Sequence, residues 1–343
     1  MPYKRPPLSK TYLAGTSTTE QLYVMSPAAL EKANIEFIGG VRAKSIHRVA
    51  KTLLLEDGRS LPYSKLVLAT GGRPRLLSCP GADLPGIFAL RGIADVESIR
   101  TQFQPGKRLV IVGGGYIGLE VAAVAVKAGL SVAVLESMPR VLQRVTAPEM
   151  SVFYERVHRE AGVDLRTNVQ LSGFEKAGAA LKVLLGDGSA LDADLVIVGI
   201  GLIANTELAA EAGLTVDNGI VVDEFARTSD PDIYAAGDCT NHPSEFLGRR
   251  IRLESVQNAM EQGRAVAANL LGKTTKYANV PWFWSDQYEL KLQMVGISTG
   301  YDSVVLRGDP KGRSFGAFYL KDGQVIAADM VSRLQEFMVA KKI

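Results

Sequence analysis

The sequence predicts an α/β fold in which one structural plan is used twice and is followed by a small antiparallel sheet. Residues 108–136 read as strand, glycine turn, helix and parallel strand. The segments 35–72 and 163–201 share one order of features at an offset of about 130 residues, which indicates an internal repeat. After residue 280, stretches such as "KLQMVGIS" alternate apolar and polar residues, as strands of a half-buried sheet do.

The unit at 108–136 has the order of a βαβ crossover. A β-branched run at 109–112 enters the glycine turn, and an alanine- and valine-rich helix then runs to about Lys127. Gly129 ends this helix before a second strand at 131–135. Two parallel strands need such a connection, which is right-handed in nearly all proteins.

The glycine turn contains the pattern G-x-G-x-x-G at Gly113, Gly115 and Gly118. The first glycine permits the tight turn, the second lets the backbone approach a pyrophosphate, and the third packs the helix on the strand. Glu136 ends the next strand, where a carboxylate accepts hydrogen bonds from ribose hydroxyls and repels a 2′-phosphate, which favours NADH. Arg140 weakens this preference because an arginine can pair with a phosphate. An ordinary glycine turn is the alternative.

The repeat predicts an incomplete first copy. An Asp-Gly turn at Asp57 matches one at Asp187, and both copies read as a strand, a meander that contains this turn and a buried strand that ends in glycines. In the second copy the glycine-loop unit precedes the meander, so its counterpart in the first copy would lie before residue 1. We therefore expect the first βαβ to be missing and the proline-rich loop at 2–10 to be the segment that followed it. The sheet of that domain would then have a gap and unpaired edges.

The remaining elements follow from local signals. We expect the following: a hairpin at 216–223, a short buried strand within 228–238, a helix at 254–271 that Gly272 ends, a boundary at 279–287, and a final helix near 332–342.

Composition limits the possible functions. The net charge of +3 is too small to indicate nucleic-acid binding, and no apolar run approaches the ~20 residues of a membrane helix. Cys79 and Cys239 lie far apart in the sequence and form no CxxC pattern, which argues against a disulfide framework or a metal cluster. The sequence therefore predicts a protein of the reducing cytoplasm, without metal, nucleic acid or membrane.

Glu120 is an unusual residue in its segment, because its helix is otherwise apolar. Burying a carboxylate is costly unless it has a partner. Since Glu120 lies just past the glycine turn, it could face a nicotinamide. The alternative is an exposed position on the helix.

Six motifs together resemble one family. "PYKRPPLSK", "LATGGRPR", "VGGGYIGLE", "TSDPDIYAAGDC", "ESVQNA" and "PWFWSDQ" occur in order along the whole chain and resemble the FAD-dependent NADH:ferredoxin reductases of the putidaredoxin-reductase type. The resemblance implies a two-dinucleotide-binding-domain, glutathione-reductase-like flavoprotein fold with a small C-terminal α+β domain. It implies these domains: FAD-binding at 1–106 and 224–279, NAD-binding at 107–223, and a C-terminal interface domain at 280–343.

The resemblance also implies catalytic roles. Arg5 and Lys10 would lie along the FAD, with Lys10 near flavin N5 and paired with Glu120. Such a pair would supply fixed charge during hydride transfer. Trp284 would lie at the mouth of the flavin pocket, where an iron–sulfur partner docks. A solvated lysine and an aromatic core residue are the alternatives for Lys10 and Trp284.

The other candidates divide between two nucleotide sites. For FAD, the resemblance implies Val41, Ala69, Thr70, Gly71, Arg75, Asp238, Ser255 and Val256, besides Arg5, Lys10 and Trp284. For NAD, the candidates are Gly113, Gly115, Tyr116, Ile117, Gly118, Glu136, Arg140, Gly199 and Gly201. Asp238 can also be a turn-forming residue. The start of the helix at Val256 would point its positive end at the reduced flavin.

The expected reaction is transfer of a hydride from NADH to FAD and of single electrons to a [2Fe–2S] ferredoxin, which serves a P450 or a ring-hydroxylating dioxygenase. No cysteine pair is available for thiol–disulfide chemistry, and Cys239 reads as a small buried residue. The alternatives are an NADH:rubredoxin or nitrite-type reductase, and a flavin-free, NADH-binding fragment without activity. The flavin-free fragment is an alternative because, in this family, the FAD pyrophosphate is bound by the βαβ that we expect to be missing.

Overall fold

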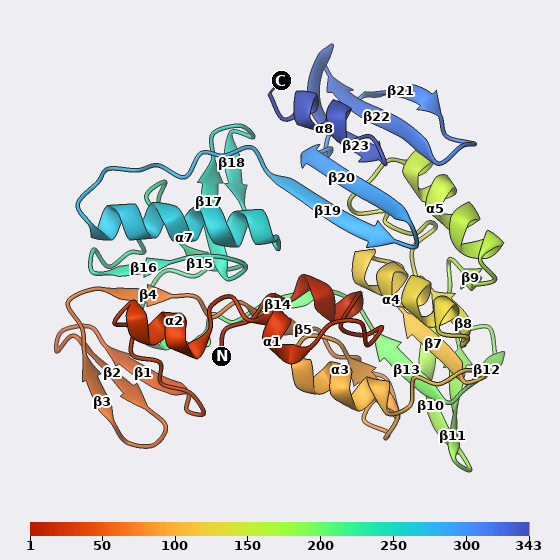
Figure 1. The fold of residues 1–343 in the computed structure, drawn as a ribbon, viewed down its shortest axis with the longest axis horizontal. Coiled ribbons are helices and arrows are strands. Elements are labelled where there is room, and N and C mark those ends of the chain that lie inside the picture. The colour runs from red at the N-terminus through yellow and green to blue at the C-terminus, as the bar shows by residue number, and fades with distance from the viewer. Residues whose placement is uncertain (343) are drawn as a thin grey trace. The chain divides into compact units, whose positions relative to one another are not determined.

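The structure of the chain is a computed structural model that describes residues 1–342 (Figure 1). It divides into two units, each formed by separate segments of the chain. Unit 1 contains residues 1–29, 74–201 and the part of the chain from 284 onward, and unit 2 contains residues 30–73 and 202–283.

Unit 1 is built on a five-stranded sheet that contains the predicted βαβ. Strands β7 (Arg108–Val112) and β8 (Ser131–Leu135) are parallel neighbours connected by α4 (Tyr116–Lys127), which confirms the predicted unit. The order β6-β13-β7-β8-β9 is completed by β6 (Ile87–Ala89), β13 (Leu195–Val198) and β9 (Asp164–Arg166), with parallel pairing throughout. Four of the five residues of β7 are buried, as the apolar run of a central parallel strand requires.

A three-stranded antiparallel meander packs on this sheet. It consists of β10 (Leu171–Ala177), β11 (Ala180–Leu185) and β12 (Ala190–Ala193). Its Phe174 and Val183 share a core cluster with Val112. Two more helices of unit 1 are α3 (Ile93–Arg100) and α5 (Pro148–Glu160), and α5 begins with proline at the position where a missing N–H costs nothing.

The end of the chain forms the expected antiparallel sheet. Its order is β19-β20-β23-β22-β21, and its bounds are Trp282–Gln287, Leu290–Gly296, Gln324–Val331, Ser314–Lys321 and Ser303–Asp309 in that order. Helix α8 (Leu334–Ala340) follows, which confirms the predicted final helix. The N-terminal loop contributes the 3-10 helix η1 (Pro6–Ser9) and the short helix α1 (Thr19–Leu22).

Unit 2 contains the first copy of the repeat. A meander of β1 (Ala43–His47), β2 (Thr52–Leu55) and β3 (Ser60–Pro62) precedes β4 (Leu66–Leu68). An Asp-Gly turn lies between β2 and β3, as another does between β11 and β12 of the second copy. The repeated meander confirms that the two segments share one plan.

The predicted strand at the start of the first copy is wrong. Residues 35–38 form no strand, and Ile35 and Phe37 are 49% and 47% exposed. In the second copy the equivalent strand β9 pairs with β8. A strand needs a neighbour to satisfy its backbone groups, and among residues 1–342 no strand pairs with 35–38. Within the same range, the sheet of β4 contains only one other strand, β16 (Ile233–Ala235), which is parallel to it.

Short elements complete unit 2. They are α2 (Pro27–Lys32), which begins in unit 1, β5 (Gly72–Pro74), β14 (Leu202–Ala204), α6 (Glu207–Glu211), β15 (Ile220–Val221), β17 (Thr240–Ser244), β18 (Arg249–Ile251) and α7 (Val256–Leu270). The predicted hairpin at 216–223 is reduced to a single antiparallel bridge between Val216 and Ile220, because β15 pairs with β17 instead.

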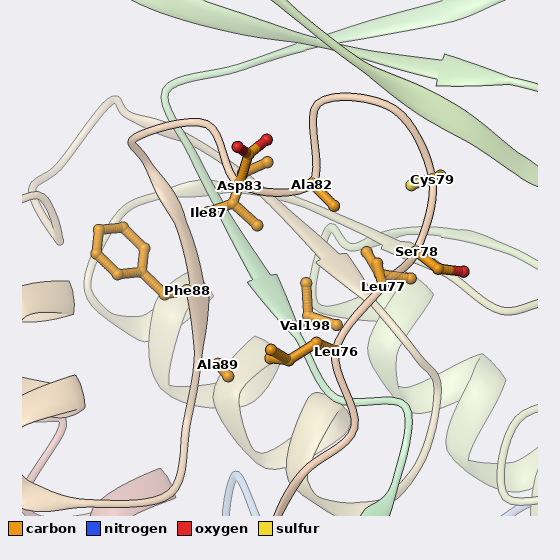
Figure 2. Close-up of a pocket in the computed structure, with 10 residues that line it drawn as sticks. All are labelled: Leu76, Leu77, Ser78, Cys79, Ala82, Asp83, Ile87, Phe88, Ala89 and Val198. Atoms are coloured by element: carbon orange, nitrogen blue, oxygen red, sulfur yellow. The ribbon is translucent and has the colours of Figure 1, made fainter.

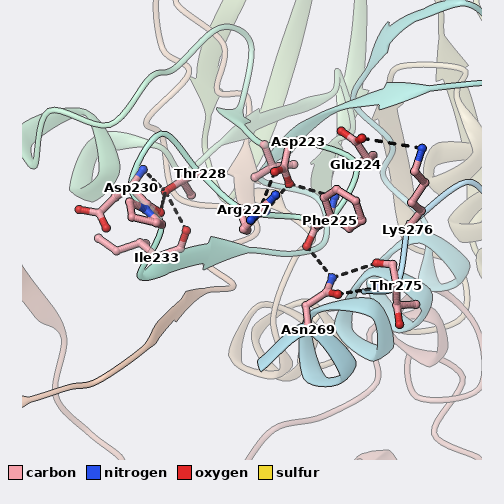
Figure 3. A network of polar contacts seen from close by, with 12 residues as sticks. Asp223, Glu224, Phe225, Arg227, Thr228, Asp230, Ile233, Asn269, Thr275 and Lys276 are labelled. Carbon is pink, nitrogen blue, oxygen red and sulfur yellow. Dashed lines mark hydrogen bonds and ion pairs between the residues drawn. The ribbon is translucent and has the colours of Figure 1, made fainter. Parts of the chain in front are cut away.

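A polar network joins the end of α7 to the loop before β16 (Figure 3). The Asn269 side-chain amide donates to the carbonyl oxygens of Phe225 and Thr275, at 2.9 Å each. Lys276 pairs with Glu224 at 3.8 Å. These contacts fix α7 within unit 2. None of the helices of residues 1–342 is long and apolar enough to cross a membrane.

Candidate active site

The glycine turn has the geometry that the motif predicts. Gly113 has φ +113°, and a Cβ there would lie 2.4 Å from the carbonyl oxygen of Gly199. A Cβ on Gly118 would lie 2.1 Å from the carbonyl oxygen of Gly113. A Cβ on Gly115 meets no atom within 4 Å. The first and third glycines are therefore required by internal packing, whereas the second faces open space at the start of α4.

This open space lies beside the N-terminus of a twelve-residue helix. Gly115 is the N-cap of α4, and Tyr116 and Ile117 are its first two residues. Free N–H groups and the helix dipole at such an end attract phosphate. Gly201, after β13, has φ +115° and open space around it as well. The residues present fit a dinucleotide, because the positions where backbone must approach a ligand carry no side chain.

Glu136 holds the glycine turn in place. Its carboxylate accepts hydrogen bonds from the N–H of Gly114 at 2.7 Å and from the N–H of Met138 at 2.8 Å, and the residue is 8% exposed. Each carboxylate oxygen can accept a second bond. Glu136 can therefore support the loop and still accept from a ribose hydroxyl.

Arg140 makes its contacts within the protein. Its guanidinium donates to the carbonyl oxygens of Thr146 and Gln143 at 2.9 and 3.1 Å, and to Ser151 Oγ at 2.7 Å. These bonds fix the loop before α5. Pairing of Arg140 with a phosphate stays a prediction.

The predicted Lys10–Glu120 pair is confirmed. Lys10 Nζ lies 2.6 Å from Glu120 Oε2, and the side chains are 17% and 2% exposed. Glu120 is therefore not an exposed helix position, and Lys10 is not a solvated lysine. Two hydroxyls also donate to this carboxylate: Ser9 Oγ at 2.5 Å and Ser285 Oγ at 2.7 Å. Sequence reasoning missed both serines.

The other FAD candidates of unit 1 have varied contacts. Arg5 donates to the carbonyl oxygen of Arg91 and lies 5.3 Å from the ring centroid of Tyr3. Arg75 is exposed, and its backbone N–H donates to the carbonyl oxygen of Gly201 at 2.9 Å. Trp284, on β19, is partly buried.

The FAD candidates of unit 2 gather at one edge of a parallel strand pair. Ala69, Thr70 and Gly71 follow β4, and Asp238 follows its neighbour β16. Parallel strands end at the same edge of a sheet, where open α/β folds bind ligands. The Thr70 hydroxyl donates to the carbonyl oxygen of Asn205 at 2.6 Å, which leaves its lone pairs to accept from another group. Val41 is partly buried in the loop before β1.

Helix α7 supports the turn that contains Asp238. Ser255 is its N-cap and accepts from the N–H of Asn258 at 3.1 Å, so the helix begins at Val256. Gln262 Oε1 accepts from the N–H of Gly237 at 2.7 Å and from the Thr240 hydroxyl at 2.9 Å.

Two polar atoms on α7 point to a ligand or water in unit 2. Asn258 Oδ1 and Gln262 Nε2 belong to fully buried residues and have no hydrogen-bond partner among residues 1–342. Such atoms are rare in folded proteins, because an unpaired buried group costs free energy. The group that binds in unit 2 would satisfy them. Sequence reasoning missed both residues, although polar side chains four positions apart in a buried helix are a usable signal.

The cysteines do not form a redox pair. Both Cys79 and Cys239 are free thiols. Cys239 is fully buried, and its thiol donates to the carbonyl oxygen of Ala236 at 3.4 Å, as expected for a small buried residue.

Cys79 lines a separate pocket of unit 1 with a volume of about 350 Å³ (Figure 2). The other lining residues are Leu76, Leu77, Ser78, Ala82, Asp83, Ile87, Phe88, Ala89 and Val198. Asp83 is the one charged residue of this lining. An apolar pocket with a negative charge does not suit a pyrophosphate.

Comparison with known proteins agrees with this geometry. Residues 1–263 match the model of the pyridine nucleotide-disulphide oxidoreductases, and residues 282–343 match that of the reductase C-terminal domain. Putidaredoxin reductase from Pseudomonas putida is 51% identical, over all of this chain and 83% of its own length. The 5,5′-dehydrodivanillate O-demethylase ferredoxin reductase subunit from a Sphingobium species is 43% identical, over all of this chain and 84% of its own length.

A solved structure has the same fold. The crystal structure of the covalent putidaredoxin reductase–putidaredoxin complex matches with a TM-score of 0.97 at 50% identity, over all of this chain and 84% of that one. The expected two-nucleotide flavoprotein fold is therefore confirmed. Membership of this group implies FAD and NAD(H) as cofactors. The chain belongs to the pyridine nucleotide-disulphide oxidoreductase family, in the branch of ferredoxin reductases that includes putidaredoxin reductase.

Proposed function

We propose that this chain is an NADH-dependent flavoprotein reductase that passes electrons through FAD to a [2Fe–2S] ferredoxin serving a P450 or a ring-hydroxylating dioxygenase. The observation that carries the proposal is the similarity, over the whole of this chain, to putidaredoxin reductase, which has been crystallised as a covalent complex with putidaredoxin. The free, separate cysteines support electron transfer rather than thiol–disulfide exchange.

The proposed NADH site is the glycine turn with Glu136. Gly113, Gly115 and Gly118 would let the pyrophosphate lie against the N-terminus of α4. Glu136 would accept from the adenosine ribose and repel a 2′-phosphate, which selects NADH over NADPH. Tyr116, Ile117, Gly199 and Gly201 would border the same ligand, and Arg140 would lie beyond Glu136.

A functional division into an FAD-binding domain at 1–106 and 224–279, an NAD-binding domain at 107–223 and an interface domain at 280–343 is part of the proposal. In unit 2, Asp238 would accept from the ribityl chain, and the N–H of Val256 would donate to the flavin ring at the positive end of α7. The other proposed FAD contacts are Arg5, Lys10, Val41, Ala69, Thr70, Gly71, Arg75, Ser255 and Trp284.

The Lys10–Glu120 pair supplies fixed charge at the proposed reaction centre. The bound cofactors would supply the redox chemistry, hydride transfer from NADH to FAD and single-electron transfer to the iron–sulfur partner. Lys10 and Glu120 would orient the rings in a site from which packed side chains exclude water. A preorganised charge pair costs no reorganisation during the transfer. Trp284 would contact the partner that accepts the electrons.

Reconstitution tests the proposal. The chain is incubated with FAD, freed of excess cofactor and scanned for flavin absorbance, and NADH-driven reduction of putidaredoxin is then followed by absorbance. We expect retained FAD, and faster reduction with NADH than with NADPH. Binding of NADH without retained FAD would contradict the proposal and favour a flavin-free fragment. Faster reduction of rubredoxin or of a nitrite reductase partner would favour the alternative electron acceptors.

We also propose that the protein works in the reducing cytoplasm. Cys79 is partly buried and Cys239 fully buried, and neither forms a disulfide within the described residues. Free thiols persist where glutathione and thioredoxin keep them reduced.

A further inference from the structure

A line of buried hydrogen bonds leads from Glu120 into unit 1, away from Lys10. Ser285 Oγ lies 2.7 Å from Glu120 Oε1, and Gln287 Nε2 lies 3.2 Å from Ser285 Oγ. Gln287 Oε1 lies 2.9 Å from His158 Nε2, and His158 Nδ1 lies 3.0 Å from the Tyr288 hydroxyl. This line joins α4, β19, α5 and the turn after β19.

The three middle residues have no access to water. Ser285, Gln287 and His158 are all 0% exposed. A buried polar group without a partner costs free energy, so such a line is stable only when each member is satisfied. Each of the three binds a neighbour on both sides. Apolar side chains would be sufficient to pack β19 against α5, so three buried polar side chains in one line call for another explanation.

The chemistry of the ends fixes the direction of every bond. Glu120 pairs with a lysine and so is a carboxylate, which only accepts; the Ser285 hydroxyl must therefore donate to it. Ser285 has then used its proton, so Gln287 donates through its NH₂ group and turns its oxygen toward His158. Burial lowers the pKa of His158 to about 4, so the ring is neutral. Its single proton lies on Nε2 to meet the amide oxygen, and Nδ1 accepts from Tyr288.

All four donors therefore point toward Glu120. Hydrogen bonds arranged head to tail polarise one another, and here the positive ends face a carboxylate. The line is not a path for protons, because the Gln287 amide cannot pass a proton on without changing its tautomer. Its effect is electrostatic.

We propose that Ser285, Gln287 and His158 are positioning residues for Glu120, which hold its carboxylate oriented toward Lys10. The proposal rests on the proposed function, in which this pair lies beside the reacting rings. The other groups that face Glu120 are the Ser9 hydroxyl, and the hydroxyls of Tyr116 and Tyr154, whose pKa values burial raises. Both tyrosines are neutral, so Lys10 is the one full charge among these neighbours.

If the line orients Glu120, a change at Tyr288, its far end, should affect Glu120 although the two residues do not touch. Tyr288→Phe removes only the outermost donor, and Tyr301→Phe is the matched control, because Tyr301 lies in the same C-terminal segment, where it contacts the ring of Tyr319. With FAD-loaded protein, we expect Tyr288→Phe to slow reduction of the flavin by NADH about threefold, with the KM for NADH unchanged. In a Glu120→Gln background the same substitution should have no effect.

Ser285 provides the second pair of variants. We expect Ser285→Ala to slow flavin reduction about tenfold at unchanged KM, and Ser285→Thr, which keeps the hydroxyl, to restore most of the rate. Equal rates for wild type and Ser285→Ala in an active enzyme would overturn the inference while leaving the proposed function intact. Equal slowing by Tyr288→Phe in the wild-type and Glu120→Gln backgrounds would also overturn it, because the effect would then be structural.

Equilibrium unfolding in urea tests the same coupling without cofactor or turnover. We expect Tyr288→Phe to raise the unfolding equilibrium constant about threefold in the wild type and by less than half of that in Glu120→Gln. The same increase in both backgrounds would refute the proposal. An enzyme that retains no FAD but shows the coupling would refute the proposed function and support the line of hydrogen bonds.

Discussion

Removing one partner of the Lys10–Glu120 pair should destabilise the protein, and the two partners should not be equivalent. Breaking a buried ion pair costs about 3 to 5 kcal/mol, because the remaining charge is left buried and uncompensated. Lys10→Met leaves such a carboxylate on a residue that is 2% exposed. Since the hydroxyls of Ser9 and Ser285 still donate to it, we expect a cost near the lower limit, about 3 kcal/mol.

Glu120→Gln should cost less. The Lys10 side chain is 17% exposed, so its ammonium can turn toward water, and the neutral amide can still accept from the serine hydroxyls. We expect a loss of about 1 to 2 kcal/mol. The double variant should lose about as much as Glu120→Gln alone, so the coupling energy should equal the Lys10→Met loss, about 3 kcal/mol.

Urea unfolding followed by circular dichroism measures these values at pH 7. Lys4→Met is the control, because Lys4 is an exposed lysine of the same N-terminal loop and should change stability by less than about 0.5 kcal/mol. A Lys10→Met variant as stable as this control would refute the reasoning. So would a double variant whose loss equals the two single losses added together, because the two charges would then be independent.

Three further predictions concern titration and the glycine turn. Burial lowers the pKa of His158 to about 4, against 6.5 in the unfolded chain, so between these pH values the unfolded chain binds one more proton than the folded chain. The free energy of unfolding should therefore fall by about 3 kcal/mol as the pH falls from 6.5 to 4. Urea unfolding at several pH values should show that His158→Gln removes this contribution to the pH dependence. Burial raises the pKa of Asp329 to about 7, against 3.8 in the unfolded chain, so between these pH values the folded chain binds one more proton than the unfolded chain. The free energy of unfolding should therefore fall by about 4 kcal/mol as the pH rises from 3.8 to 7. An Asp329→Asn variant with the same pH dependence of stability as the wild type would contradict this. Gly118→Ala should lower the melting temperature because its Cβ would strike Gly113, whereas Gly115→Ala should keep it and weaken NADH binding in a fluorescence titration.

Local patterns were sufficient for the elements of unit 1 that carry the nucleotide motif. The β-branched run and the glycine spacing of 108–136 produced strands and a helix where expected, because a parallel core strand and a tight turn are specified by neighbouring residues. The strand expected at 35–38 failed for the opposite reason. Its sequence permits a strand, but a strand forms only against another strand, and among residues 1–342 none is paired with it.

The candidate site shows the same limit. Lys10 and Glu120 are 110 residues apart, and only the resemblance to a family linked them before the structure did. Ser9, Ser285 and Gln262 were missed because serine and glutamine are common residues whose role depends on tertiary packing. Arg140 was read from its distance to Glu136 along the chain, whereas the direction of its guanidinium is set by the loop before α5.

The proposed ribose contact of Glu136 would constrain any redesign of nucleotide preference, because the same carboxylate supports the glycine turn. A designer who wants the phosphorylated coenzyme would replace this acid with an apolar or basic side chain, which has no acceptor. That exchange would also free the N–H groups of Gly114 and Met138, which the carboxylate now ties down. The same substitution that removes the negative charge would therefore also remove the hydrogen bonds that hold the glycine turn. A successful exchange requires a second substitution that supplies a new acceptor for those two amides.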